Sequence, residues 1–333
     1  MENEQEKWIL VTGGTGYIGS HTVLELLKCG KRVLIVDNLS TSDINNYYRL
    51  KVKYPDASLL FRKIDLRDKQ SLSQLFEIYS FNTVIHFAGY KSVGESVRDP
   101  LKYYNNNLYS TMVLLEVMNK YGVKNIIFSS SASVYGIPEC LPIPETHPLN
   151  PQSPYGKTKY FIEEILRDVA YSDSEFNCVI LRYFNPVGAD PSKILKENPK
   201  GKPENLMPYI VKVIRGEYPH LNIFGDDYQT KDGTGVRDYI HINDLALGHI
   251  AALKVFEKKD TNVHIYNLGT GTGYSVKELV NCMRKYSKKS IPTKIVDKRS
   301  GDVPICYADP NKAFEELGWK AEKDIHKMCQ DSI

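Results

Sequence analysis

A tyrosine and a lysine four positions apart give the strongest signal for chemistry in this chain. Ser153 can cap a helix whose first position is Pro154, so Tyr155 and Lys159 would lie one turn apart on the same helix face. A free tyrosine, with a pKa of about 10, is a poor base at neutral pH. A nearby ammonium and the N-terminal helix dipole both favour the phenolate, so the pair predicts a tyrosine base. The same spacing also occurs by chance in surface helices of a chain with 23 tyrosines.

A run of serines precedes this segment. Residues 129–135 read Ser-Ser-Ser-Ala-Ser-Val-Tyr and follow a strand expected at 125–128. Ligands of open α/β sheets bind at the carboxyl ends of the strands. A serine there can hydrogen-bond a reacting hydroxyl and help to move its proton. The pattern does not tell which serine faces the site, and serines are also common at strand ends and in turns.

Three glycines, Gly13, Gly16 and Gly19, lie between an expected strand and an expected helix. Glycines permit a tight turn and let the backbone approach a pyrophosphate, which then meets the free N–H groups of the helix. Asp37 ends the second expected strand, roughly twenty residues downstream. Its carboxylate can accept hydrogen bonds from an adenosine ribose and would repel a 2′-phosphate, which favours NAD over NADP. A turn or capping aspartate is the alternative for Asp37. Asp65, before Leu66, either receives an adenine or caps a helix.

Alternating strands and helices must position these residues. We expect strands at 8–12, 32–36, 59–64, 83–87, 125–128 and 178–182, and helices at 17–29, 72–78, 101–121 and 154–170. This alternation predicts an α/β fold, a Rossmann doubly wound parallel sheet with a smaller C-terminal α/β domain. Prolines and glycines cluster between Pro186 and Pro208. We therefore expect a dinucleotide-binding domain at 1–185 and a substrate domain at 186–333, with later segments such as 236–268 returning to the first.

Composition narrows the class of protein. The chain has 333 residues, 42% hydrophobic and 25% charged, which is typical of globular proteins. A net charge of +3 is too small to suggest a nucleic-acid partner, and the basic run at 284–299 is expected to be a solvated face. The six cysteines lie far apart, which indicates neither a metal site nor a disulfide framework. Without an apolar targeting or membrane-spanning segment, we expect a cytoplasmic protein with no membrane partner.

The motifs together resemble the extended short-chain dehydrogenase/reductases and, within them, the sugar-nucleotide 4-epimerases. The resemblance covers essentially the whole chain. The segments that carry it are Thr12–Gly19, Asp37, Phe87–Lys91, the serine run, Tyr155 with Lys159, Leu181–Gly188 and Gly235–His241.

This resemblance implies roles for individual residues. Ser131 would be the catalytic serine, Tyr155 the base and Lys159 its partner, which also holds the nicotinamide ribose. Cofactor contacts are implied for Gly13, Gly16, Tyr17, Ile18, Gly19, Asp37, Asn38, Asp65, Leu66, Phe87, Ala88, Gly89, Lys91, Asn106 and Phe184. Substrate contacts are implied for Asn185, Asn205, Leu206, Phe224, Arg237, Arg299, Asp302 and Cys306. The two arginines would clamp a pyrophosphate through charge-assisted hydrogen bonds.

The implied activity is reversible inversion of C4 in UDP-glucose and UDP-galactose. Tyr155 would take the proton of the 4-hydroxyl while the C4 hydride passes to NAD, and the 4-keto sugar would turn over on its UDP tether before the hydride returns. NAD would thus be a tightly bound cofactor that is not consumed. The resemblance also implies a homodimer formed through the helices at 101–121 and 154–170.

Cys306 bears on the range of substrates. Some members of the family carry a tyrosine here, against the hexose 2-position. A smaller cysteine would leave room for an N-acetyl group, so we hypothesise action on UDP-GlcNAc and UDP-GalNAc as well. The alternative is a small buried hydrophobic residue without a role in specificity.

Two other functions would use parts of the same pattern. Another NAD-dependent UDP-sugar-modifying enzyme, such as a 4,6-dehydratase or a decarboxylase, could use the same scaffold. A dehydratase needs a further acid/base pair to expel the 6-hydroxyl, and Ser131-Ala132-Ser133 contains no carboxylate. A non-catalytic NAD sensor is the second alternative, but a sensor has no need of a tyrosine base.

Overall fold

Seven parallel strands form the main sheet of the computed structural model, which describes residues 7–195, 197, 203–257, 262–299 and 302–333. The spatial order is β3-β2-β1-β4-β5-β6-β10. These strands are β1 (Trp8–Thr12), β2 (Val33–Asp37), β3 (Leu59–Lys63), β4 (Phe81–His86), β5 (Asn125–Ser131), β6 (Asn177–Tyr183) and β10 (Val263–Leu268). From β1 the next strands are added on one side, as β2 and β3, and from β4 onward they are added on the other side. Dinucleotides bind in Rossmann sheets at this reversal of strand order, between β1 and β4. The predicted fold class is confirmed.

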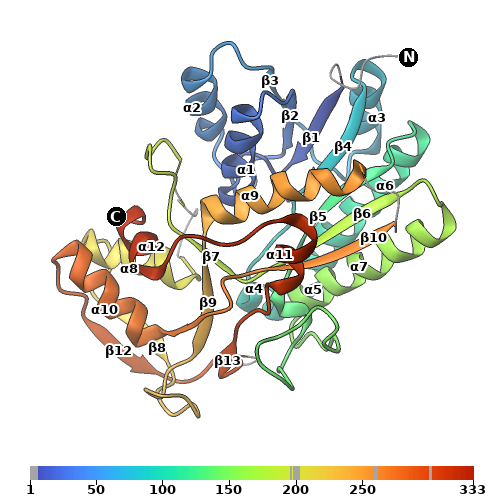
Figure 1. The fold of residues 1–333 in the computed structure, drawn as a ribbon. Coiled ribbons are helices and arrows are strands. Elements are labelled where there is room, and N and C mark those ends of the chain that lie inside the picture. Colours follow the sequence, from blue (N-terminus) through green and yellow to red (C-terminus); the bar gives the residue numbers. More distant parts are fainter. Residues whose placement is uncertain (1–6, 196, 198–202, 258–261, 300–301) are drawn as a thin grey trace.

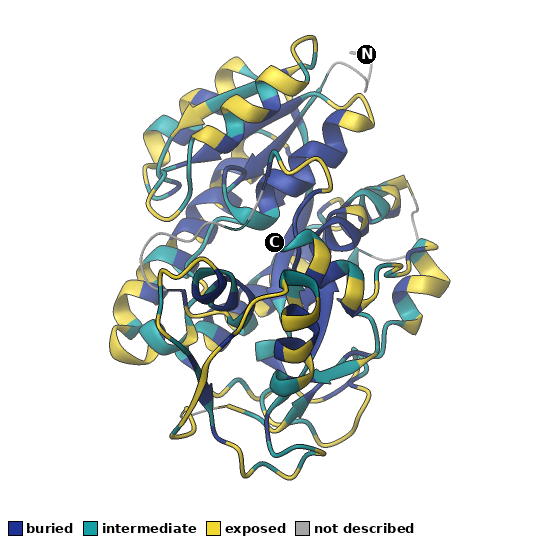
Figure 2. Cartoon of the chain, turned by 90° about the vertical axis from the view of Figure 1, so that its left-hand side faces the viewer, coloured by how far each residue is buried: buried dark blue, intermediate teal, exposed yellow. Residues whose placement is uncertain are grey.

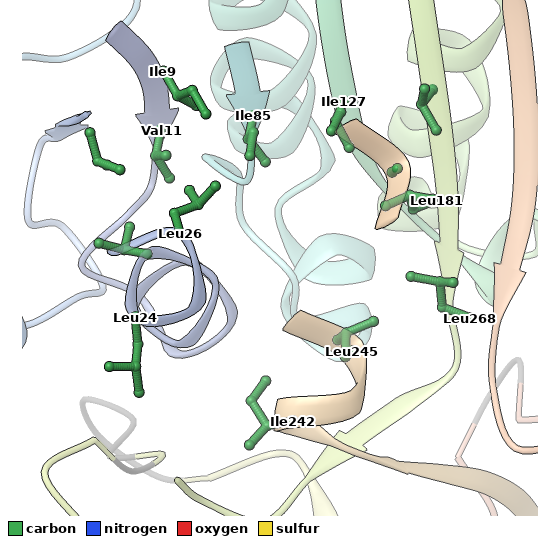
Figure 3. Packing of buried hydrophobic residues seen from close by; sticks show 14 of the residues in the cluster. Ile9, Val11, Leu24, Leu26, Ile85, Ile127, Leu181, Ile242, Leu245 and Leu268 are labelled. Carbon is green, nitrogen blue, oxygen red and sulfur yellow. The ribbon is translucent and has the colours of Figure 1, made fainter. Parts of the chain in front are cut away.

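Helices cover both faces of this sheet because successive strand residues point to opposite sides. Ile9 and Val11 of β1 pack with α1 (Tyr17–Lys28) and α9 (Ile242–Leu253), as Figure 3 shows. Leu10 belongs to the core on the other face, under α3 (Lys69–Ile78), α6 (Ser110–Lys120) and α7 (Pro154–Ser172). The strands in the middle of the molecule are accordingly buried, whereas the helices expose their outer sides (Figure 2).

The helix expected at 101–121 is present as a continuous helical segment that consists of α5 (Pro100–Tyr103), a π-helical turn (Tyr104–Tyr109) and α6. The short helix α4 (Val93–Arg98) lies before it. The Asn107 side chain accepts a hydrogen bond from the Tyr90 N–H over 2.8 Å and donates to the Tyr90 carbonyl over 3.0 Å. It also donates to Thr158 Oγ1 over 3.1 Å. This side chain bonds to the segment after β4 and to α7, and π turns of this kind often occur at functional sites.

A smaller α/β part lies to one side of the main sheet (Figure 1). Strand β9 pairs with three short strands, and β8 pairs with β12. The strands are β7 (Asn185–Val187), β8 (Leu221–Phe224), β9 (Val236–His241), β11 (Gly273–Ser275), β12 (Thr293–Val296) and β13 (Ile305–Cys306). The remaining α-helices of the described residues are α8 (Leu206–Ile214), α10 (Val276–Ser287) and α12 (Ile325–Asp331), together with α2 (Asn45–Lys53), which contacts α1, and α11 (Asn311–Leu317), which contacts β10.

The chain crosses between the two parts more than once. Strand β9 belongs to the smaller sheet, the following helix α9 packs against α1, and β10 joins the edge of the main sheet. The helices α8, α10 and α12 share a separate hydrophobic core with β8. The boundary at residue 185 therefore stays a prediction.

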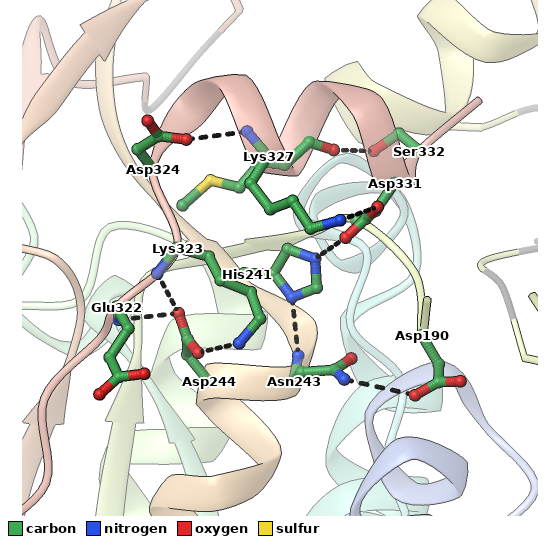
Figure 4. A network of polar contacts seen from close by, with 12 residues as sticks. Asp190, His241, Asn243, Asp244, Glu322, Lys323, Asp324, Lys327, Asp331 and Ser332 are labelled. Atoms are coloured by element: carbon green, nitrogen blue, oxygen red, sulfur yellow. Dashed lines mark hydrogen bonds and ion pairs between the residues drawn. The ribbon is translucent and has the colours of Figure 1, made fainter. Parts of the chain in front are cut away.

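A polar network fastens the C-terminal helix to the rest (Figure 4). His241 accepts the Asn243 N–H at Nδ1, so its Nε2 carries the proton and donates to Asp331 over 3.1 Å. Lys327 donates to the same carboxylate over 2.8 Å, and the Asn243 side chain reaches Asp190. This network connects α12 to the loop that follows β7.

Within the described ranges, no helix has the length and apolar character that a membrane span requires.

Candidate active site

The glycine-rich turn follows β1 at the carboxyl edge of the main sheet. Gly13 has φ +68°, and a Cβ there would lie 2.7 Å from the Ala88 nitrogen at the end of β4. A Cβ on Gly19 would lie 2.4 Å from the Gly13 carbonyl oxygen. Gly16 occupies the N-cap position of α1, and no side chain of the described residues caps this helix. The first N–H groups of α1 thus remain available to an anion, and the residues fit the pyrophosphate of a dinucleotide.

Asp37 is the buried last residue of β2, and it bonds to the glycine-rich turn. One carboxylate oxygen accepts the Thr15 hydroxyl at 2.7 Å and the Thr15 N–H at 3.2 Å. The other oxygen accepts from the Leu39 N–H at 2.9 Å and the Ser42 hydroxyl at 2.8 Å. These bonds fix the carboxylate beside the turn, where a ribose can reach it.

Asp65 does not cap a helix, so that alternative is wrong. The cap of α3 is Asp68, which accepts the Ser71 N–H over 3.1 Å. Asp65 bonds instead to Arg67, which holds the pKa of the carboxyl well below its usual range, and to Asn38 over 3.0 Å. Asn38 and Asp65, two of the expected cofactor residues, are thus neighbours, and Leu66 beside them is buried.

The segment after β4 runs alongside the glycine-rich turn. The Phe87 and Ala88 N–H groups donate to the backbone and side-chain oxygens of Thr12, over 3.1 and 3.3 Å. A Cβ on Gly89 would lie 3.3 Å from the Asn107 side chain. Phe184, buried directly after β6, lies on the same edge of the sheet.

Three expected cofactor residues make protein contacts here. Lys91 forms an ion pair with Glu197 at 3.1 Å, and Asn106 donates to the Asn107 side chain over 3.0 Å. The Tyr17 hydroxyl donates to the Gly188 carbonyl over 2.6 Å, while Tyr17 is also the first residue of α1.

The structure brings Ser131, Tyr155 and Lys159 together at the ends of β5 and α7. Ser131 is the last residue of β5, and its hydroxyl lies 3.2 Å from the Ser133 hydroxyl. Lys159 is buried and donates to the Ser129 carbonyl over 2.6 Å. Tyr155, on the first turn of α7, hydrogen-bonds Ser131. Proton transfer at a bound hydroxyl needs such a set of groups.

The pKa of Tyr155 is raised in the protein without cofactor, whereas the sequence predicted a lowered value. Burial raises the pKa of Tyr155, and the hydrogen bond with Ser131 only partly opposes this. Burial also lowers the pKa of Lys159 to about 8, although the nearby Glu163 carboxylate acts in the other direction. Burial is the larger of the two effects on Tyr155, so without the cofactor the pKa of this tyrosine lies above its ordinary value.

The expected substrate residues form a second group, in the smaller part. Arg237 on β9 and Arg299 both face Asp302, at 3.7 and 3.6 Å. The Arg299 guanidinium also lies 4.0 Å from the centre of the Phe224 ring. Cys306 on β13 is in register with Arg237. Two guanidinium groups beside one carboxylate, one of them over an aromatic ring, suit a nucleoside diphosphate.

The other expected substrate residues lie at the starts of elements. Asn205 is the N-cap residue of α8 and makes no capping hydrogen bond through its side chain, and Leu206 begins that helix. Asn185 is the exposed first residue of β7, directly after Phe184.

Sequence reasoning missed several residues of this site. Thr15 donates a hydrogen bond to Asp37, and Asn107 accepts one from the segment after β4. Tyr228 interacts electrostatically with Arg237, Arg299 and Asp302. Thr15 stands inside the glycine motif, so its position was a usable signal. No local signal pointed to Tyr228. In the described part of the chain, no three His, Cys, Asp or Glu side chains are placed to hold a metal ion.

Comparisons with known proteins agree with this geometry. The family model described as GDP-mannose 4,6 dehydratase matches residues 10–332. The UDP-glucose 4-epimerase of Bacillus subtilis is 53% identical over 325 residues, which are 97% of this chain and 95% of the relative. The crystal structure of the Bifidobacterium longum UDP-glucose 4-epimerase with NAD+ and UDP superposes with a TM-score of 0.94 at 49% identity, covering 98% of this chain and 97% of that one. A UDP-Glc/GlcNAc 4-epimerase from Campylobacter jejuni superposes with a TM-score of 0.84 at 37% identity and covers 98% of each chain.

Proposed function

The chain belongs to the UDP-glucose 4-epimerase family, and on that premise we propose that it interconverts UDP-glucose and UDP-galactose. The observation that carries the proposal is the placement of Ser131, Tyr155 and Lys159 at the sheet edge that also holds the glycine-rich turn. The reaction is a reversible inversion at C4 through a 4-keto sugar, with no net oxidation.

NAD is the cofactor, held at the start of α1 and beside Asp37. When bound, it supplies a reversible hydride acceptor and a cationic ring, which favours the phenolate of a neighbouring tyrosine. The glycines of the turn admit its pyrophosphate, and the Asp37 carboxylate disfavours a 2′-phosphate. We propose the remaining expected cofactor residues, among them Phe87, Ala88 and Phe184, as contacts on the same edge.

Tyr155 accepts the proton of the sugar 4-hydroxyl and returns it to the product alcohol. Ser131 hydrogen-bonds that oxygen, and the Lys159 ammonium favours the phenolate while the Ser129 carbonyl fixes its position. The two directions of the reaction use the same groups, because the 4-keto sugar presents first one face and then the other.

Arg237 and Arg299 hold the UDP part firmly, so that the hexose can turn without leaving. Asp302 faces both arginines, and the Phe224 ring lies against Arg299. We propose Asn185, Asn205 and Leu206 as further substrate contacts, in a UDP-sugar domain at 186–333 that adjoins a cofactor domain at 1–185.

We further propose that UDP-GlcNAc and UDP-GalNAc are substrates. Cys306 shares a buried cluster with Phe184 and is in register with Arg237. Phe184 is a proposed cofactor contact and Arg237 belongs to the proposed pyrophosphate clamp, so we propose that the hexose lies beside Cys306. Its thiol stays neutral, because burial raises its pKa to about 11. The similarity to the structure of the Campylobacter jejuni UDP-Glc/GlcNAc 4-epimerase supports this wider range.

We also propose a cytoplasmic homodimer. Leu101, Tyr109 and Met112 expose apolar side chains on the helical segment before and within α6, and Phe161 does so on the neighbouring α7. Exposed apolar residues of this number on adjacent helices favour burial against a second copy. The six free thiols support a reducing compartment.

The decisive experiment incubates the purified enzyme with UDP-glucose and separates the products. UDP-galactose is expected, whereas a dehydrated sugar or a pentose would identify another UDP-sugar-modifying enzyme. Denaturation of the same preparation should release NAD in a one-to-one ratio. Tyr155→Phe should keep this NAD and lose turnover by roughly a hundredfold or more, as removal of an acid/base group does. Unchanged turnover in that variant would contradict the assigned base.

A further inference from the structure

A fully buried ion pair lies beside the catalytic groups and has no part in the proton transfer described above. Arg182 on β6 and Glu163 on α7 expose 1% and 0% of their side chains. They meet at 2.6 Å through Nη2 and Oε2, and at 3.1 Å through Nε and Oε1. Apolar pairs in such positions are often as stable or more stable, so stability alone does not account for two charges here.

Hydrogen bonds tie this pair to the strands that carry the site. Ser130 donates to Glu163, and Ser130 directly precedes Ser131 on β5. Arg182 also donates to the Tyr135 hydroxyl over 3.0 Å, and this hydroxyl donates to Asn267 on β10 over 2.6 Å. A single carboxylate thus connects α7 to both β5 and β6, the three elements whose ends carry the catalytic residues and Phe184.

Charge connects the pair to Lys159 as well. Glu163 follows Lys159 by one helical turn on the buried face of α7, and its carboxylate raises the pKa of this lysine against the effect of burial. His86 faces Lys159 from β4 and is neutral, since burial lowers its pKa to about 3. Tyr135 and Cys178 face the pair from the loop after β5 and from β6, and burial raises the pKa of both, so they too are neutral.

We propose that Glu163 is a positioning residue for the epimerisation, which holds Ser131 and Lys159 in register and supplies the negative charge that Lys159 faces. The inference rests on the proposed function. Removal of the charge leaves the Arg182 cation uncompensated in the same interior, and this cation destabilises the Lys159 ammonium. The reaction would then lose its protonated lysine at a lower pH.

The test is the pH profile of kcat in Glu163→Gln, which keeps the shape of the side chain. Its alkaline limb is expected to move down by about one pH unit, so that kcat at the alkaline end falls roughly tenfold. KM for UDP-glucose should stay near the wild-type value, because Arg237 and Arg299 are untouched. The double variant Glu163→Gln with Arg182→Gln removes both charges of the ion pair, so no uncompensated cation remains there. The alkaline limb of its kcat profile should return toward the wild-type pH.

Two results would overturn the inference and leave Glu163 a structural residue. The alkaline side of the kcat profile could stay at the wild-type pH in Glu163→Gln, or it could stay displaced in the double variant. If Glu163→Gln does not retain NAD, Glu163→Asp decides, because it keeps the charge but shortens the reach. Its kcat should fall without a movement of the limb, and a moved limb overturns the inference. A wild-type enzyme that fails to form UDP-galactose would contradict the proposed function itself.

Discussion

The Asp37 carboxylate accepts the Thr15 hydroxyl at 2.7 Å and the Thr15 N–H at 3.2 Å. The residue that ends β2 is therefore bonded to the turn between β1 and α1. We therefore expect the Asp37 carboxylate to have two roles. It fixes the turn that would receive the pyrophosphate, and it would present a negative charge to the adenosine ribose.

Replacement of Asp37 by alanine should weaken the hold on NAD. A hydrogen bond to a charged group contributes about 1.5–3 kcal/mol, so we expect roughly 10–100-fold weaker retention. The measurement is NAD released per chain on denaturation after extensive dialysis. Asp43→Ala is the matched control, because Asp43 lies in the same loop and its carboxylate bonds only to Asn45 among the described contacts. Equal NAD content in both variants would disprove the role of Asp37.

Gly19→Ala should disrupt the cofactor turn. The new methyl would lie 2.4 Å from the Gly13 carbonyl oxygen and 2.8 Å from the Gly14 Cα, and both are backbone atoms that cannot rotate away. We expect loss of most of the bound NAD and about 1–3 kcal/mol of lost stability from overpacking. Thermal unfolding and NAD content check this.

Gly94→Ala is the control for that substitution. Gly94 lies in α4, where the nearest atom to a new Cβ is 3.6 Å away, so the methyl fits. This variant should keep its NAD and unfold at or slightly above the wild-type temperature, because alanine favours a helix over glycine by about 1 kcal/mol. A Gly19→Ala protein that behaves like Gly94→Ala would show that the turn tolerates a side chain.

Cys306→Tyr should narrow the substrate range. A tyrosine ring in this buried position would occupy the space proposed for the N-acetyl group. We expect kcat/KM for UDP-GlcNAc to fall at least about tenfold while the value for UDP-glucose changes little. Cys306→Ala keeps the space open and should turn over both sugars. Unchanged turnover of the N-acetyl pair by Cys306→Tyr would refute the proposed wider range.

The sequence predicted the main sheet well because its signals are local. Each core strand is a short apolar run, and the glycine spacing stands between a strand and a helix, so β1 matched the expected residues and α1 ended one residue early at Lys28. The helix ends also followed local rules: Gly30 adopts φ +68° just beyond the C-cap of α1.

The details that the sequence did not reveal depend on residues far apart in the chain. The expected helix at 101–121 contains a π turn because Asn107 bonds to Tyr90, seventeen positions earlier. The ion-pair partner of Glu163 is Arg182 on β6, and the periodicity along α7 cannot reveal it. The sequence shows the lysine near Tyr155 but not the burial that raises the pKa of this tyrosine.

Buried histidines should make the protein less stable in mild acid. His86 accepts or donates hydrogen bonds with Thr12 at 2.7 Å and Thr111 at 2.9 Å, and burial lowers its pKa to about 3. The pKa of an unfolded histidine is about 6.5, so between these values the unfolded chain binds a proton that the folded chain excludes. Stability is thus complete above pH 6.5 and declines as the pH falls toward 3. At pH 5 this one group costs about 2 kcal/mol.

His86→Gln should remove that part of the pH dependence. Urea unfolding at pH 7, 6 and 5 would show a decline that is about 2 kcal/mol smaller than in the wild type. The variant starts from a lower stability at pH 7, because glutamine cannot reproduce both threonine bonds, so the slope is the quantity to compare. His220→Gln, at a partly exposed position before β8, is the matched control and should keep the wild-type slope. If His86→Gln declines as steeply as the wild type, His86 is protonated in the folded protein and the interior near Lys159 is more polar than its burial indicates.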